Sequence, residues 1–133
     1  MNTTVAERSW CVIVPHHARG ARMARHRLIA ALTDEVPADL VADVAAVAAE
    51  LIGNAVRHAA PLPGGVIRVD WRVFGAGTVE VRVTDGGSAE PPQVREATPE
   101  AVDGRGLTIV AALASRWGFD RDVHGQSVWA ELG

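Results

Sequence analysis

Three polar side chains recur at every fourth position between residues 50 and 58. Glu50, Asn54 and His58 advance only about 40° around a helix at each step, so they form one stripe with Arg57 beside it. These acid–base and ligand-binding groups border the apolar side of the helix, where they are costly unless they find partners. The stripe therefore indicates a binding or catalytic site, and the alternative is a helix edge exposed to water.

Two glycine-containing segments carry further candidate chemistry. Residues 84–87, Thr-Asp-Gly-Gly, end a predicted strand, and the alternative there is a simple Asp-Gly turn. Gly104 and Gly106 precede a predicted helix, where backbone N–H groups can close on an anion. Arg105 between them can pair with a phosphate as a fork. The alternative for this second segment is a flexible hinge.

The composition excludes several classes of site. The chain has 133 residues, and all 13 of its Lys and Arg residues are arginine. The absence of lysine rules out a phosphate-binding loop of the type that requires one, and it also rules out Schiff-base chemistry. The single cysteine, Cys11, excludes an intramolecular disulfide, and its apolar neighbours predict a buried structural thiol. Length and composition predict one globular domain over residues 1–133, with no membrane span. Residues 1–10 contain no apolar secretory segment, so we expect a cytoplasmic protein.

The charge is uneven along the chain. Residues 1–33 carry five arginines against one acid, a net +4, whereas residues 34–133 carry eight against fifteen, a net −7. Four of the early arginines lie on one predicted helix. A basic helix can follow phosphates, but arginines without interleaved aromatic residues more often form a solvated face or a surface for an acidic protein. We expect no direct contact with nucleic acid. The four residues are Arg19, Arg22, Arg25 and Arg27.

Hydrophobic periodicity predicts the elements that position these residues. A strand at Trp10–Val14 is followed by two helices, the first after Pro15 and the second from Asp39 to about Ala59. Strands at 66–73 and 79–83 form a hairpin with one polar face. A long loop, 85–106, a third helix and two more strands complete the order. The predicted fold is α+β, a two-layer α/β sandwich with three helices on one face of a mixed, mostly antiparallel sheet. The third helix contains Leu107–Ala114, and the last strands are 116–122 and 127–132.

The motifs, in this order on these elements, resemble those of the Bergerat-fold ATPases, which include gyrase, heat-shock chaperone, histidine kinase and mismatch-repair proteins. Residues 50–58, ELIGNAVRH, look like the N box, and 85–87 look like the start of the first glycine box. Residues 104–107, GRGL, look like the second glycine box. The small size and the ending VWAEL at 128–132 resemble the anti-sigma factor, serine-protein kinase branch. The resemblance extends from about Trp10 to Leu132.

The resemblance implies a nucleotide site with assigned roles. Asn54 would bind Mg²⁺, Glu50 would orient or deprotonate the attacking hydroxyl, and Asp85 would accept a hydrogen bond from the adenine amino group. Gly87 would let the base approach the backbone, and residues 88–103 would form a lid over the nucleotide. Phosphate contacts would come from the second glycine box and the end of the N box: Gly104, Arg105, Gly106, Leu107, Arg57 and His58.

The sequence also departs from the family pattern. The second glycine of the first box falls on Ala89. The chain has no phosphoacceptor-histidine helix, and 133 residues leave no room for a dimerisation domain, which argues against a sensor histidine kinase. Two functions remain. One is an anti-sigma factor that binds a sigma factor and phosphorylates an anti-sigma antagonist on serine. The other is a non-catalytic, nucleotide-gated interaction module. The family often dimerises through its sheet, which leaves a homodimer open.

Overall fold

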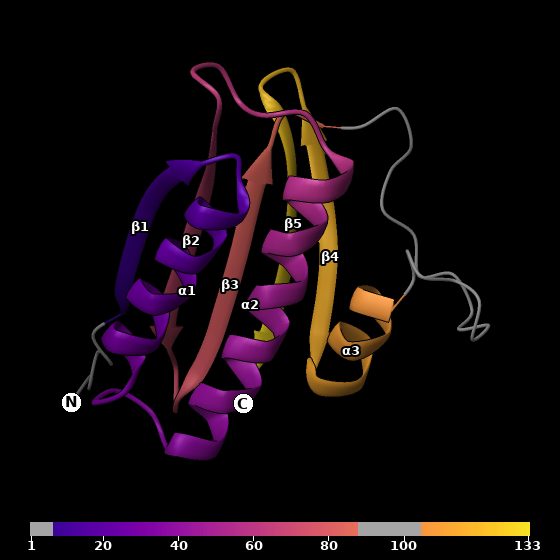
Figure 1. The fold of residues 1–133 in the computed structure, drawn as a ribbon. Coiled ribbons are helices and arrows are strands. Elements are labelled where there is room, and N and C mark those ends of the chain that lie inside the picture. Colours follow the sequence, from indigo (N-terminus) through magenta and orange to yellow (C-terminus); the bar gives the residue numbers. More distant parts are fainter. Residues whose placement is uncertain (1–6, 88–104) are drawn as a thin grey trace.

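The computed structural model describes residues 7–87 and 105–133, and the positions considered below lie within these ranges unless stated otherwise. Eight helices and strands occur in the predicted order (Figure 1). Strands and helices are listed here by residue range: β1 Arg8–Pro15, α1 Ala18–Leu32, α2 Ala38–His58, β2 Val66–Phe74, β3 Thr78–Asp85, α3 Arg105–Leu113, β4 Arg116–Asp122 and β5 Gly125–Leu132.

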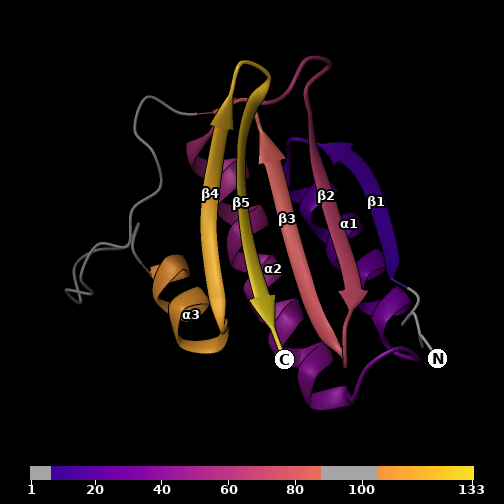
Figure 2. The same ribbon diagram turned by 180° about the vertical axis from the view of Figure 1, so that it is seen from behind.

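The five strands form one sheet in the order β1-β2-β3-β5-β4. All four pairings are antiparallel, so the described sheet is antiparallel throughout rather than mixed. The α+β two-layer architecture is confirmed. Figure 2 shows the face of the sheet that the helices leave open.

The helices pack on one side of the sheet (Figure 1). α1 and α2 lie across it, and α3 packs against α2 near the edge strand β4. Apolar residues recur along α2 at helical spacing, and this stripe faces the sheet. The buried members of the stripe are Val41, Val44, Val47, Ala48, Leu51, Ile52 and Ala55.

Alternation along the strands gives the sheet two different faces. In β3, Val79, Val81 and Val83 are fully buried under the helices, whereas the residues between them are half-exposed. This confirms the predicted hairpin with one polar face. The prediction for Cys11 was wrong, because its side chain is exposed. β1 is an edge strand and the alternation places Cys11 on the open face, so its apolar neighbours in sequence do not cover it.

Most predicted boundaries agree with the structure to within two residues. The second helix ends at His58 and the turn at His124-Gly125 is present, although β5 begins at Gly125 rather than at Ser127. Most of the predicted long loop, residues 88–104, lies outside the described residues. None of the helices within 7–87 and 105–133 combines the length and the apolar character that a membrane span requires.

Candidate functional site

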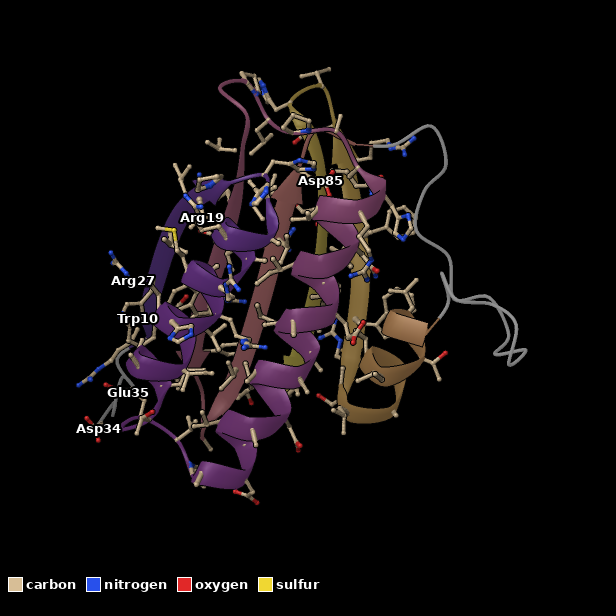
Figure 3. All side chains as sticks on the ribbon, in the orientation of Figure 1. Trp10, Arg19, Arg27, Asp34, Glu35 and Asp85 are labelled. Carbon is tan, nitrogen blue, oxygen red and sulfur yellow. The ribbon has the colours of Figure 1, made fainter. Side chains whose placement is uncertain are left out.

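Two polar side chains are buried in the described part of the chain, and they are neighbours. Asp85, at the end of β3, is 3% exposed, and Gln126, at the start of β5, is 4% exposed. Their Cα atoms are partners in the antiparallel ladder, so both side chains lie on the helix-covered face. Figure 3 shows Asp85 beside the last turns of α2. Burial of a polar side chain costs free energy. Two such side chains next to each other therefore distinguish this end of the sheet from the rest of the covered face.

The turn after β3 is joined to the chain that leaves α2. The Gly87 N–H donates to Asp85 Oδ1 at 2.7 Å. Two backbone bonds link Ala60 to this turn, from Gly86 N–H to the Ala60 carbonyl and from Ala60 N–H to the Gly87 carbonyl. A Cβ atom on Gly86 would lie 2.2 Å from the Pro61 carbonyl oxygen, so only glycine permits this approach. The Asp-Gly-Gly sequence is therefore a turn and also the bridge between Asp85 and α2.

His16 supports the same junction from the other side. Its Nε2 lies 2.9 Å from the Ala55 carbonyl oxygen and 2.8 Å from the Ala59 carbonyl oxygen, so it donates to the C-terminal turn of α2. No role was predicted for His16 from the sequence. No local pattern could have revealed its role, because its partners are about 40 positions away in the chain.

Burial raises the pKa of the Asp85 carboxyl. The hydrogen bond from Gly87 N–H and the nearby His16 and Arg121 side chains act in the opposite direction, because they favour the charged form. A carboxylate removed from water is a strong acceptor for a ligand N–H group that replaces the lost solvent. This is a chemical property suited to recognition of an amino group.

The predicted polar stripe lies on the last three turns of α2. Glu50 and Asn54 are half-buried, whereas Arg57 and His58 are exposed. An Arg57 Nη2–H donates to Asn54 Oδ1 at 3.1 Å. A Cβ atom on Gly53 would lie 2.8 Å from Arg57 Nη1. The mid-helix glycine thus leaves room for the guanidinium to fold back over the helix.

The second glycine segment is described only in part. Gly104 and the predicted lid at 88–103, which includes Ala89, lie outside the described residues. α3 begins at Arg105, so the helix N-terminus lies within the segment, two residues before the predicted start at Leu107. The Leu107 side chain is buried, and any ligand contact at this position would come from the backbone.

No group of three or more His, Cys, Asp or Glu side chains that could hold a metal occurs among the described residues. A metal ion at this site would therefore not be coordinated by a cluster of those side chains. Asn54 offers a single neutral amide oxygen, which suits Mg²⁺ that keeps several waters and takes its remaining ligands from phosphates. The donor set fits a metal that arrives with a nucleotide.

A hollow of about 540 Å³ occurs on the open face of the sheet, away from these residues. It contains charged side chains that pair with one another, such as Arg68 with Asp70 along β2 and Arg72 on β2 with Glu80 on β3. None of the sequence-predicted site residues lines it. The candidate site is therefore the helix-covered end of the sheet around Asp85.

Comparison with known proteins agrees with this architecture. The family model of the histidine kinase-like ATPase domain matches residues 14–132. Among solved structures, the crystal structure of the RsbU and RsbW domains of Rv1364c from Mycobacterium tuberculosis is similar, with a TM-score of 0.70 and 21% sequence identity. The match covers 94% of this chain but 31% of that chain, and at this identity it shows the fold. The search of curated proteins gave no match. Because the family model spans nearly the whole sequence, the chain belongs to the histidine kinase-like ATPase domain family.

Proposed function

We propose that the end of the sheet around Asp85 binds ATP with Mg²⁺. The observation that carries this proposal is the buried Asp85 carboxylate, held by Gly87 N–H beside the helix that carries Asn54. An adenine amino group would donate to Asp85, and Gly87, which has no side chain, would let the base approach the backbone. Asn54 would contribute its amide oxygen to Mg²⁺.

The phosphates would lie between the end of α2 and the start of α3. Backbone N–H groups at Gly104, Gly106 and Leu107 would face them at a helix N-terminus. Arg105 would add a guanidinium fork, since the chain has no lysine to do so. Arg57 and His58, exposed at the end of α2, are further candidates for phosphate contact.

We propose phosphoryl transfer to a protein serine as the reaction. Glu50 lies one helical turn before Asn54 and is half-buried. It would accept the proton of the serine hydroxyl while that oxygen attacks the γ-phosphorus of ATP. The bond from the γ-phosphorus to the bridging oxygen then breaks, and ADP leaves. Phosphoryl transfer depends mostly on positioning and charge neutralisation, so these groups suffice in principle. Mg²⁺ would supply charge neutralisation at the phosphates.

The partner proposal rests on α1. Four of its arginines, Arg19, Arg22, Arg25 and Arg27, are exposed, and their guanidinium groups have no hydrogen bond or ion pair with any described residue. Figure 3 shows Arg19 and Arg27 on the outer side of α1. Such a face is complementary to an acidic protein. Together with the likeness to a structure that contains an RsbW domain, this supports a sigma factor and an anti-sigma antagonist as partners.

Isothermal titration with MgATP tests the binding proposal. We expect measurable affinity in the wild type, loss of the Mg²⁺-dependent part in Asn54→Ala, and no change in the control Asp43→Ala, which alters an exposed residue earlier on α2. Equal affinity of the wild type and Asn54→Ala with and without Mg²⁺ would contradict the role of Asn54.

The reaction needs a separate assay with the cognate antagonist. We expect phosphoserine from the wild type and none from Glu50→Ala, with ATP affinity retained in both. If the wild type binds ATP and releases its partner but forms no phosphoserine, the non-catalytic interaction module is the correct function.

The partner surface can be tested by charge reversal. Arg22→Glu with Arg25→Glu should weaken antagonist or sigma-factor binding at least tenfold and leave ATP affinity unchanged. Loss of ATP affinity with intact partner binding would refute this surface. Binding of duplex DNA that the reversal abolishes would show that the face contacts nucleic acid instead.

A further inference from the structure

Arg57 covers the oxygen atom that the proposed function assigns to the metal. An Arg57 Nη2–H donates to Asn54 Oδ1 at 3.1 Å. The two residues lie three positions apart on α2, and side chains at this spacing on a helix are neighbours. Asn54 has a single side-chain oxygen, and its amide nitrogen is a donor that does not bind cations. The oxygen that would coordinate Mg²⁺ is therefore occupied by a cationic group of the protein itself.

Gly53 makes this contact possible. A Cβ atom at this position would lie 2.8 Å from Arg57 Nη1 and 3.2 Å from Nη2, so the guanidinium packs directly on the bare backbone. Glycine within a helix is less favourable than alanine, and here its missing side chain provides the space that Arg57 fills. An alanine at position 53 would push the guanidinium away from the Asn54 oxygen without removing its charge.

One hydrogen bond holds the guanidinium in this position. The Arg57 side chain is exposed, and it forms no ion pair with an acidic side chain within residues 7–87 and 105–133. A guanidinium has five N–H donors, and the Asn54 oxygen takes one of them. The others can contact a phosphate while the bond to Asn54 persists. A metal ion is different, because two cations on one amide oxygen repel each other.

We propose that Arg57 is a positioning residue that competes with Mg²⁺ for Asn54 Oδ1 and thereby sets how strongly ATP binding depends on the metal. This inference rests on the proposed ATP-binding function. Without metal, Arg57 donates to the Asn54 oxygen and keeps the amide in one orientation. When MgATP binds, Arg57 releases this oxygen, and its guanidinium remains available for the phosphates.

The test measures the magnesium preference, which is the ratio of the affinity for MgATP to the affinity for ATP in EDTA, by isothermal titration. Gly53→Ala displaces the guanidinium but keeps its charge. We expect it to raise the magnesium preference about fivefold, because one hydrogen bond no longer has to be broken when the metal binds. Its affinity for metal-free ATP should be unchanged. Arg57→Met removes both the contact and a phosphate partner, so its magnesium preference should rise at least as much while metal-free ATP binds more weakly.

Asp43→Ala is the matched control, because it also places alanine in α2, at an exposed position earlier on the helix. Its magnesium preference should equal that of the wild type. Gly53→Ala combined with Asn54→Ala should behave as Asn54→Ala alone, since no contact remains to be broken. A wild-type or reduced preference in either Gly53→Ala or Arg57→Met would overturn this inference and leave ATP binding intact. Failure of the wild type to bind ATP with or without Mg²⁺ would overturn ATP binding itself.

Discussion

Polar side chains have opposite environments on the two faces of the sheet. On the open face, charged residues are numerous and paired across strands, as in Arg72 with Glu80 and Arg82 with Asp120. The helix-covered face is apolar except at one end, where Asp85 and Gln126 are buried. Asp85 has one hydrogen bond from its own turn and a pKa raised by burial.

This difference shows that polar residues are present on the two faces for two different reasons. Exposed, paired charges keep their water and contribute little to stability or to specific binding. Burial of a carboxylate costs stability, so the presence of Asp85 indicates a ligand that completes its hydrogen bonds. The location of the buried carboxylate therefore identifies the site better than the location of the hollow on the open face.

The largest effect should come from the apolar part of the covered face. Ile67, on β2, is fully buried among the helices. Ile67→Ala removes packed apolar atoms and leaves a cavity, so we expect the free energy of unfolding to fall by about 2–5 kcal/mol. Chemical denaturation measures this value. A loss below about 1 kcal/mol would show that this face is less tightly packed than its burial indicates.

A smaller effect on stability, with the opposite sign, should follow from Asp85→Asn. Asparagine keeps the Oδ1 acceptor for Gly87 N–H and removes the buried charge. We expect the free energy of unfolding at neutral pH to be unchanged or higher and ATP affinity to fall about a hundredfold, because a donor now faces the adenine amino group. Titration and denaturation of the same sample measure both. Destabilisation with full ATP affinity would contradict the assignment.

The pH dependence of the stability difference between the wild type and Asp85→Asn sharpens this prediction. The folded-state pKa of Asp85 is raised, so the folded state binds more protons than the unfolded state between the ordinary and the raised value. The contribution of Asp85 to stability is therefore most favourable below that window and is lost as the pH rises through it. The stability advantage of Asp85→Asn over the wild type should shrink as the pH falls through the window. A constant difference at every pH would show that Asp85 has an ordinary pKa.

The smallest effect is expected on the open face. Arg82 Nη1 lies 2.8 Å from Asp120 Oδ2, and the Asp120 side chain is 67% exposed. A double-mutant cycle with Arg82→Ala and Asp120→Ala should give a coupling energy below about 1 kcal/mol, and neither variant should change ATP affinity. A larger coupling, or a loss of ATP affinity, would assign the open face a role that we do not give it.

Much of the fold was predictable because its signals are local. The apolar stripe of α2 and the alternation at 66–73 and 79–83 each lie within one element, and periodicity reveals them. The exposure of Cys11 was not predictable from its neighbours, since it depends on which side of an edge strand the helices cover.

The candidate site was predictable only in part, for a similar reason. The motif residues Glu50, Asn54 and Asp85 stand in recognisable local sequences. The contacts of His16 and of Gln126 with Arg121 join residues from different elements. They emerge only when the strands and α2 are packed together.

The central claim is that MgATP binds at the helix-covered end of the sheet. Backbone amide chemical shifts of the labelled protein, recorded by NMR during MgATP titration, test it most directly. We predict large saturable shifts at Asp85, Gly87 and Gln126, and none at Arg68 or Arg82 on the open face. Saturable shifts confined to the open face, or no shifts at any MgATP concentration, would contradict the account.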